Sequence, residues 1–561
     1  MDQFTLEIIE NTLVAIGDEM FWTLQRTAQS SLIFEVLDFA VGATDATGEL
    51  IAQGNGVAGF LGTLDAAVKS VLEKHGAKGD IHPGDLFITN DPYGGGGTHL
   101  SDVSIIMPVF YDGEIVAFTV NKAHWSELGG KDPGSVSADA TEVYQEGLQL
   151  PNIKLFHRGE VDDALLDLIG ANCRLPRMTL GDLWAGVAAA RVGERRVTEL
   201  CKKYGKDTVL ASMIRLLEYG EKMVKLELQK LPKGVFEAED WVDDDGTGAG
   251  PFLVKAKITI TDDEFVVDYT GSCDQVVGPI NSTYTGLVSS ARSVFKALTN
   301  PSIPANGGAF RALKVICPEG NIFSARRPAP VSMYFESMLF GSDLIWKALA
   351  PHVPDRLTAG HLLSVCATKV YGTHPDTGDF WMIYEPLVGG WGAGEDKDGE
   401  PGQFCVGDGE TYNIPVEVTE QRYGLMVDQY ALHDEDGGAG KFRGGKGVIL
   451  DYRVTGEEAF VTATFNRNKI PPWGMNGGRD GSPNYVEIRR VDGSVKTYGH
   501  TPEGVRLAKG DVVRLVTATG GGSGNPRDRP REKVLDDLKN GYITSDQAMR
   551  HYGVEQSGVA E

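Results

Sequence analysis

The chain has 561 residues, of which 41% are hydrophobic and 23% are charged, the balance of an ordinary globular protein. Acidic residues outnumber basic residues by 78 to 53, so the net charge is −25. An acidic chain of this kind lacks the basic surface that binding to nucleic acid or to an anionic membrane requires, so we expect neither partner. The length predicts two to four domains. Glycine is in excess, with 71 residues, and its clusters predict many tight turns.

Three features bear on the compartment. No run approaches 18 consecutive apolar residues, so we expect no membrane-spanning helix. The first 20 residues have no basic segment followed by a continuous apolar run, which is unlike a secretion signal. The six cysteines are scattered and form no C-x-x-C pair, which is typical of reduced, mostly buried thiols. We therefore expect a cytoplasmic protein.

The first 232 residues are predicted to form a helix-rich lobe. Apolar residues recur every three or four positions over residues 4–30 and predict a helix. Two apolar runs, at 33–41 and 50–52, flank a turn at 45–48 and predict a hairpin. Further helices are predicted over 63–75, 162–168, 180–204 and 208–231.

The pattern changes after a break at residues 230–234. Strands are predicted at 252–260 and 265–269, and helices at 289–298 and 342–350. From about residue 362 the chain alternates strands with glycine-rich turns, and residues 531–552 predict a charged helix or pair of helices. The expected fold is mixed α+β, with a helix-rich lobe whose hairpins carry the site, then a β-rich, glycine-rich lobe. The predicted domains are 1–232, 233–530 and a helical tail at 531–561, whose last residues, 555–561, we expect to be frayed.

A second hairpin brings candidate metal ligands together. Apolar runs at 103–110 and 115–120 flank Asp112 and Gly113, a strong hairpin signal. With Tyr111 opposite Glu114, Asp102 would oppose Ala123 and Ser101 would oppose His124. This register gathers three candidate ligands, which are His99, Asp102 and His124. Two imidazoles and one carboxylate can hold a divalent ion and leave a position open for water. The alternative is a turn cap and a hydrogen-bonded strand end.

Two neighbouring features extend this candidate site. Asp38 lies in the apolar run 36–40, where a buried, unpaired carboxylate would be costly, so it is either a further ligand or a solvent-facing strand end. Glycines 94–97 precede His99 directly and would allow close approach of a ligand. We therefore predict that substrate or phosphate binds to the backbone at Gly95, Gly96, Gly97 and Thr98, with a flexible turn as the alternative.

Two common catalytic motifs are missing. Residues 440–447 nearly fit a phosphate-binding loop, but Gly447 replaces the required hydroxyl and a predicted strand follows in place of a helix. No G-x-S-x-G elbow of a serine hydrolase is present. The sequence therefore predicts neither ATP binding by this chain nor a serine nucleophile.

Several motifs follow one another along the chain in a fixed order. They include Asn-Asp-Pro-Tyr at 90–93, Gly-Thr-His-Leu-Ser-Asp at 97–102, and the segments 123–130, 145–148, 278–281, 304–308, 413–417, 437–445, 471–474 and 520–524. In this order they resemble the hydantoinase B/oxoprolinase family, and the resemblance spans essentially the whole chain.

The resemblance implies a subunit of an ATP-dependent enzyme that acts on cyclic amides, such as hydantoins, 5-oxoproline or lactams. A partner of the hydantoinase A type would bind ATP and phosphorylate the substrate, and we expect a heterotetramer or larger complex. The resemblance also implies a divalent metal, either zinc or manganese with magnesium as a third candidate. Its ligands would be His99, Asp102 and His124, with Asp38 as an upstream carboxylate.

The resemblance leaves the reaction open at several points. Glu127 and Glu146 are the candidates for a general base, or for a group that orients the ligands. Residues 58–62 lack a histidine that many relatives have, and Trp125 stands where many have a second histidine. Because of these departures, the resemblance does not identify the substrate. Related ketone carboxylases give an alternative function with a ketone substrate, and a non-catalytic scaffold subunit is a further alternative.

Overall fold

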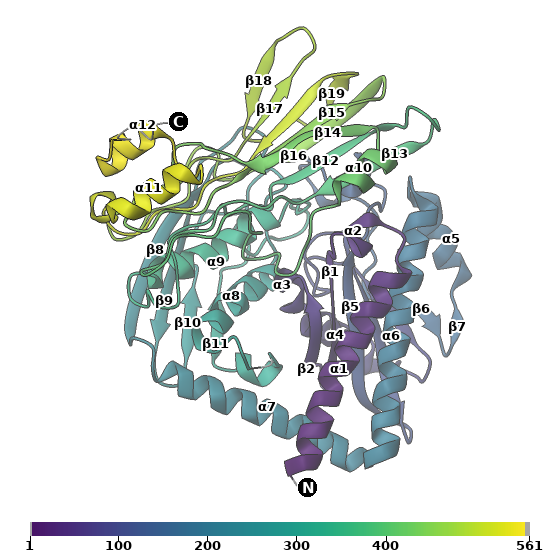
Figure 1. Cartoon of the computed structure of the whole chain (residues 1–561). Coiled ribbons are helices and arrows are strands. Elements are labelled where there is room, and N and C mark those ends of the chain that lie inside the picture. Colours follow the sequence, from purple (N-terminus) through teal and green to yellow (C-terminus); the bar gives the residue numbers. More distant parts are fainter. Residues whose placement is uncertain (1–2, 304, 556–561) are drawn as a thin grey trace. The chain divides into compact units, whose positions relative to one another are not determined.

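The computed structural model describes residues 3–303 and 305–555 (Figure 1). The chain divides into two compact units, each built from separate stretches of sequence. The first unit consists of residues 1–235, 256–342 and 407–412, and the second of 236–255, 343–406 and 413–561. The domain division at 1–232, 233–530 and 531–561 stays a prediction. Most of the segment 555–561 that we expected to be frayed lies outside the described residues.

The first unit is built on a seven-stranded antiparallel sheet. Its order is β2-β1-β5-β4-β3-β6-β7. The strands are β1 (Phe39–Asp45), β2 (Leu50–Gly56), β3 (Leu86–Thr89), β4 (Asp102–Tyr111), β5 (Glu114–His124), β6 (Ile153–His157) and β7 (Glu160–Val161). The predicted hairpin around the turn at 45–48 is therefore present as β1 and β2. The first part of the apolar run 33–41 forms a short helix instead, α2 (Ser31–Phe34).

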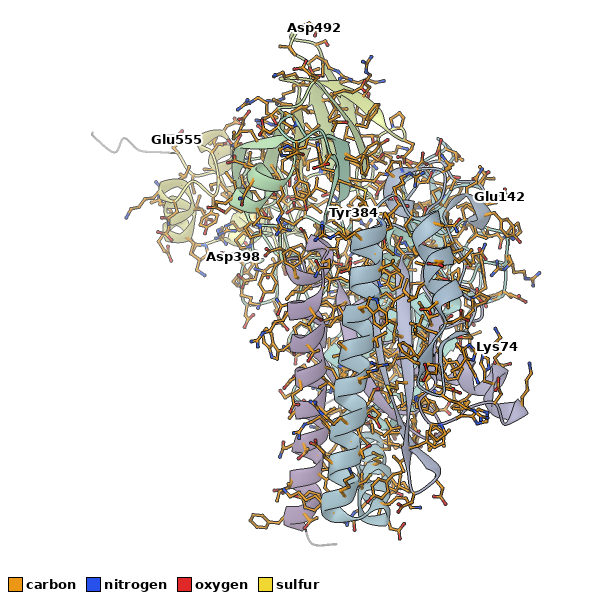
Figure 2. All side chains as sticks on the ribbon, turned by 90° about the vertical axis from the view of Figure 1, so that its right-hand side faces the viewer. Lys74, Glu142, Tyr384, Asp398, Asp492 and Glu555 are labelled. Atoms are coloured by element: carbon orange, nitrogen blue, oxygen red, sulfur yellow. The ribbon has the colours of Figure 1, made fainter. Side chains whose placement is uncertain are left out.

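Helices cover both faces of this sheet. Figures 1 and 2 show α1 (Gln3–Thr27) and α6 (Pro176–Tyr204) side by side along one face. The core under them contains Phe39 and Val41, whereas Ala40 faces the other core, which α3 (Ala58–Leu61) and α4 (Leu64–Lys74) complete. Side chains alternate between the faces of a strand, so one buried strand contributes to two cores. The remaining helices of this region are α5 (Asp163–Asn172) and α7 (Lys206–Leu228).

The register of the β4–β5 hairpin differs from the predicted one by one residue. Tyr111 opposes Glu114, as we expected. A bulge follows, because Val109 pairs with Ala117 and Val116 has no residue opposite it in β4. Asp102 therefore lies directly opposite His124, not opposite Ala123. The extra residue in β5 brings these two candidate ligands closer together than the simple register allows.

A four-stranded sheet with the order β11-β10-β9-β8 follows in the chain. Its strands are β8 (Gly234–Val242), β9 (Phe252–Ile260), β10 (Phe265–Asp268) and β11 (Leu313–Ile316). The helices α8 (Tyr284–Thr299) and α9 (Phe335–Leu349) begin five and seven residues before the predicted starts at 289 and 342. These first turns include the apolar residues Leu287, Val288, Met338 and Leu339, so the apolar pattern extends further towards the N-terminus than we predicted.

The second unit contains two more sheets, one of four strands in the order β13-β12-β16-β19 and one of five in the order β14-β15-β20-β17-β18. Their strands are β12 (Ala367–Thr373), β13 (Phe380–Glu385), β14 (Leu425–Leu432), β15 (Val448–Val454), β16 (Glu458–Thr464), β17 (Tyr485–Arg489), β18 (Val495–Tyr498), β19 (Val505–Ala508) and β20 (Val512–Val516). The helices are α10 (Val416–Arg422), α11 (Arg531–Lys539) and α12 (Ser545–Gln547), of which the last two lie within 531–552, where a charged helix or pair of helices was predicted. Within residues 3–303 and 305–555, no helix is both long enough and apolar enough to span a membrane.

Glycine-rich loops of the second unit pack backbone against backbone. Gly445 donates its N–H to the carbonyl of Trp391 at 2.8 Å, and Gly520 donates to the carbonyl of Gly445 at 3.0 Å. A Cβ atom on Gly520 would lie 2.1 Å from the carbonyl oxygen of Trp391, and one on Gly390 would lie 2.2 Å from that of Gly445. At these positions glycine is therefore required by the close approach of chain segments, whereas we predicted tight turns from the glycine clusters.

Candidate metal centre

The β4–β5 hairpin and the segments beside it position four of the predicted site residues. Asp102 is the first residue of β4 and His124 is the last residue of β5. His99 lies in the turn before β4. Asp38 precedes β1 and is not within a strand, since Leu37 has a left-handed backbone (φ 65°) and β1 begins at Phe39. The His124 N–H donates to the carbonyl of Asp38 at 3.0 Å, which holds these two segments together.

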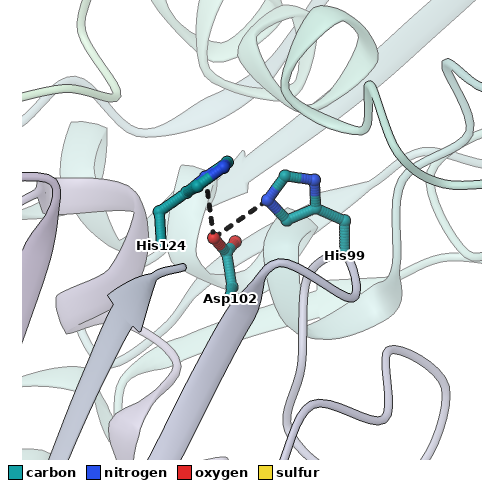
Figure 3. Close-up of side chains that lie close together, drawn as sticks. All are labelled: His99, Asp102 and His124. Carbon is teal, nitrogen blue, oxygen red and sulfur yellow. Dashed lines mark hydrogen bonds and ion pairs between the residues drawn. The ribbon is translucent and has the colours of Figure 1, made fainter. Parts of the chain in front are cut away.

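The side chains of His99, Asp102 and His124 converge on one point (Figure 3). Asp102 Oδ1 lies 2.9 Å from His99 Nε2 and 3.4 Å from His124 Nδ1. One ligand atom from each residue falls within 4.8 Å of the other two, and all three residues are buried. Asp38 Oδ2 lies 3.6 Å from His124 Nδ1. The structure thus brings together all four residues that the sequence offered as metal ligands.

Surrounding groups fix the orientation of these side chains. The other ring nitrogen of His99, Nδ1, lies 2.8 Å from the carbonyl oxygen of Ser332, to which it donates. The hydroxyl of Thr98 donates to Oδ2 of Asp102. The ring of Tyr334 lies 5.0 Å from that of His99, and the ring of Phe335 lies 6.4 Å from it. Aromatic rings and hydrogen bonds therefore enclose the cluster and restrict its rotamers.

The charges within the cluster depend on one another. Burial alone would raise the pKa of Asp102, but attraction and hydrogen bonds from His99 and His124 outweigh it and hold this pKa well below its usual range. Burial alone would lower the pKa of His99, but Asp102 outweighs burial and raises it. Burial, assisted by repulsion from His99, lowers the pKa of His124. Asp102 is thus ionised, and His124 tends towards the neutral form that binds metals.

Asp38 adds a second carboxyl group to the cluster. Burial raises the pKa of Asp38 well above its usual range, and repulsion from Asp102 and Asp408 raises it further. A divalent cation between these carboxylates would remove this repulsion. Two imidazoles and two carboxylates are also a donor set that suits zinc or manganese. The residues present therefore fit the expected metal.

The glycine loop before His99 is packed against its own backbone. The N–H groups of Gly95 and Gly97 both donate to the carbonyl of Asp91, at 3.2 and 3.1 Å. Gly96 has a left-handed backbone (φ +71°), and a Cβ atom there would meet the backbone of Ala67 at 2.3 Å. These contacts, with the Thr98 hydrogen bond, give the four residues a role in packing. Their contact with substrate or phosphate stays a prediction.

The buried cation Lys122 also holds this loop. Its ammonium donates to the carbonyl of Gly96 at 2.9 Å and to the hydroxyl of Thr63. Burial lowers its pKa to about 8, although Asp102 and Asp65 favour the charged form. Sequence reasoning missed Lys122, although a lysine inside a predicted hairpin, two residues before His124, was a signal that could have found it.

The two acids proposed as general bases make different contacts. Glu127 is fully buried and accepts the N–H groups of Gly129 at 2.6 Å and Gly134 at 2.9 Å, together with the guanidinium of Arg174 at 3.1 Å. It therefore organises the loop that follows β5. Glu146 accepts the N–H groups of Val331 and Ser332, and Ser332 in turn contacts His99. A general-base role for either acid stays a prediction.

Comparison with known proteins places this site in a family. Residues 2–526 match the family described as hydantoinase B/oxoprolinase. The chain belongs to this family. It is 32% identical to a putative D-/L-hydantoinase subunit of Pseudomonas sp. (strain NS671), over 99% of this chain and 95% of that protein. It is 31% identical to the beta subunit of the caprolactamase of Pseudomonas jessenii, over 100% of this chain and 97% of that protein.

Solved structures confirm the mixed α/β fold. The structure of the ATP-dependent caprolactamase from Pseudomonas jessenii superimposes with a TM-score of 0.94 at 30% identity, over 100% of this chain and 98% of the matched chain. A nucleotide-free acetone carboxylase structure superimposes with a TM-score of 0.92 over 100% of this chain and 80% of that one. Its identity is only 18%, so this second likeness concerns the fold alone.

Proposed function

We propose that this chain is the metal-dependent subunit of an ATP-dependent cyclic amidase and hydrolyses a substrate that a hydantoinase A-type partner has phosphorylated. The observation that carries the proposal is the buried group of His99, Asp102 and His124 within a chain that resembles hydantoinase and caprolactamase subunits over its full length. Both relatives are themselves named as subunits, which supports a partner chain.

The proposed metal would be held by His99, Asp102 and His124, with Asp38 beside them. Such an ion would act as a Lewis acid and lower the pKa of water at the site. The protein's own contribution is to hold the ligands: Ser332 orients His99, Thr98 and the two histidines keep Asp102 ionised, and burial keeps His124 neutral. The enclosed position of these groups excludes bulk water from their immediate surroundings.

The glycine-rich segment 440–447 supports the assignment of ATP to a partner. The N–H groups of Gly444 and Gly445 already donate to the carbonyls of Gly438 and Trp391, both at 2.8 Å. The segment leads directly into strand β15, whereas a phosphate-binding loop presents free N–H groups at the start of a helix. The segment therefore packs as backbone and presents no phosphate cradle.

Reconstitution with the partner chain tests the proposal. The complex is supplied with ATP and with hydantoin, 5-oxoproline or a lactam, and in parallel with acetone or acetophenone plus bicarbonate. We expect a cyclic amide to stimulate ATP hydrolysis and to be opened to its amino acid or carbamoyl product. His99→Ala should lose divalent metal and amide opening while it still binds the partner. His157→Ala, at an exposed histidine, is the matched control and should retain both.

Each other outcome has a definite meaning. Full amide opening by a metal-free H99A complex would overturn the metal-dependent mechanism. Carboxylation of a ketone without amide opening would place the chain with the carboxylases instead. A wild-type chain that binds no stoichiometric metal and only completes the partner's site would be a scaffold subunit.

A further inference from the structure

Glu146 is a buried carboxylate next to the candidate metal centre. It follows the short helical turn Val143–Gln145 and is 1% exposed. Its Oε1 accepts two consecutive backbone N–H groups, from Val331 and from Ser332, each at 2.7 Å. Its other oxygen, Oε2, is also buried and has no hydrogen-bond partner among the described residues. Its hydrogen bonds to Val331 and Ser332 thus connect it to a distant segment of the chain.

That segment, residues 329–332, is held along its length by side chains. The hydroxyl of Tyr93 donates to the carbonyl of Ala329, and the amide of Asn281 donates to that of Pro330 at 3.1 Å. The hydroxyl of Ser332 donates to the carbonyl of Ser137 at 3.1 Å. Glu146 accepts two successive N–H groups of this segment, so it fixes the orientation of the backbone there.

The segment ends at the group that orients His99. The carbonyl of Ser332 accepts the hydrogen of His99 Nδ1 at 2.8 Å. This bond sets the tautomer and the plane of the imidazole, and leaves Nε2 directed towards Asp102, 2.9 Å away. A partner on the second ring nitrogen of a metal-binding histidine commonly tunes metal affinity 10- to 100-fold.

We propose that Glu146 is a positioning residue, which holds the Val331–Ser332 peptide so that the Ser332 carbonyl orients His99 for metal binding. The role rests on the function proposed above and refines it, because it makes Glu146 a support for a ligand and not the general base. Oε1 is already engaged by two donors at short distance, which agrees with this role. Burial raises the pKa of Glu146 to about 8, so an amide is a fair substitute for its neutral form.

Two substitutions and one matched control test this role. Glu146→Ala removes the acceptor of both N–H groups, whereas Glu146→Gln retains Oε1. Asp182 is the control, because its Oδ1 also accepts two consecutive N–H groups, from Gln29 at 2.7 Å and Ser30 at 3.1 Å, while its Oδ2 is buried without a hydrogen-bond partner. Asp182→Ala should therefore destabilise the fold to a similar degree without touching the His99 cluster.

The readout is the Kd of the full-length chain for Zn²⁺ and Mn²⁺, measured by competition with a chromophoric chelator. We expect E146A to bind about 10- to 100-fold more weakly than wild type, and E146Q and D182A to stay within about 3-fold. Unchanged affinity in E146A would overturn the proposal. So would an E146Q complex that keeps metal affinity but loses amide opening, since that result identifies a general base.

A crystal structure of metal-free E146A separates this proposal from the metal assignment. We expect the Ser332 carbonyl to move beyond hydrogen-bond distance of His99 Nδ1, even if the wild-type chain binds no divalent ion. A retained bond near 2.8 Å would show that Glu146 does not position Ser332, whatever the metal content.

Discussion

Two buried clusters of charged side chains, one in each unit, are built in different ways. In the second unit, Arg467 is 1% exposed and contacts Asp240 at 2.9 Å and Asp343 at 2.7 Å, with Lys347 on the other side of Asp240. Two cations thus balance two carboxylates. In the first unit, Asp38 and Asp102 both lie beside His124, and burial, together with repulsion from Asp102 and Asp408, raises the pKa of Asp38. The difference is that the chain's own cations balance the carboxylates in the second unit, whereas the two carboxylates in the first unit lie around an imidazole, an arrangement that suits the proposed cation.

The units also differ in how their backbones pack. In the second unit, glycine-rich loops pack backbone against backbone at Gly390, Gly445 and Gly520. In the first unit, a large apolar core lies between the helices and the sheet, and such contacts are local, as where Gly17 of α1 meets Gly54 of β2. Substitutions at these glycines of the second unit should therefore destabilise the fold more than substitutions at surface glycines do.

The largest expected effect is that of Gly520→Ala. Its new methyl group would lie 2.1 Å from the carbonyl oxygen of Trp391, and the backbone segments have no room to separate. We expect a loss of more than about 4 kcal/mol of unfolding free energy, measured by urea denaturation, or no folded protein at all. Gly493→Ala is the control, because φ is +85° there but nothing lies within 4 Å, and it should cost roughly 1–2 kcal/mol. Equal costs at both sites would refute the packing argument.

Breaking the balanced network should have the next largest effect. Arg467→Met leaves Asp240 and Asp343 buried without their main cation, so we expect a loss of about 3–5 kcal/mol in urea denaturation. Arg453→Met removes an arginine whose pair with Asp428 is exposed, and should cost about 0–1 kcal/mol. If R467M unfolds like wild type, the network does not stabilise the core.

Metal should stabilise the chain through the cluster of Asp38, His99, Asp102 and His124. Zn²⁺ or Mn²⁺ at a hundred times its Kd should stabilise the native chain by about 2.7 kcal/mol, because the ion binds the folded state only. Thermal unfolding measures this as a higher midpoint, which a chelator reverses. His99→Ala should lose most of the response, whereas R467M, although destabilised, should retain it. An equal response in H99A would place the ion elsewhere.

The smallest expected effect is a pH dependence in the second unit. Burial raises the pKa of Glu385 from 4.5 to about 7, although Tyr452, Asn413 and the Ile414 N–H donate to it. The folded state thus binds more protons than the unfolded state between these values, so the unfolding free energy falls as pH rises from about 4.5 to about 7.

Glu385→Gln cannot ionise and should remove this slope. Its stability relative to wild type should rise by about 2 kcal/mol between pH 5 and pH 7.5, as measured by urea denaturation at each pH. The Tyr452 hydroxyl can rotate to accept a bond from the new amide. Parallel curves for the two proteins would show that Glu385 does not titrate in this range.

Much of the local structure could be predicted from the sequence. Apolar periodicity located α1, α4, α6 and α7, and the Asp112–Gly113 turn located the hairpin that carries Asp102 and His124. The bulge at Val116 could not be predicted, because no residue type marks it. The strand assigned to Asp38 was wrong, because a left-handed backbone at Leu37 is unusual for leucine and left no sign in the pattern.

Local sequence patterns could not predict which distant residues surround the site. His99 and Asp102 are three residues apart, so their proximity follows from spacing. Ser332 lies 233 positions after His99, and nothing near it in the sequence points to an imidazole. Likewise, the excess of glycine was evident from the sequence, but the contacts among Gly390, Gly445 and Gly520 depend on the tertiary fold.

The bond between His99 and Ser332 also sets an order of events during synthesis. The hairpin with Asp102 and His124 leaves the ribosome when the partner of His99 Nδ1, 233 residues downstream, has not been made. Contacts between such distant residues form late, because a long loop must close first. The proposed ion, which needs His99 in its final orientation, would therefore be captured only after more than half of the chain has been translated.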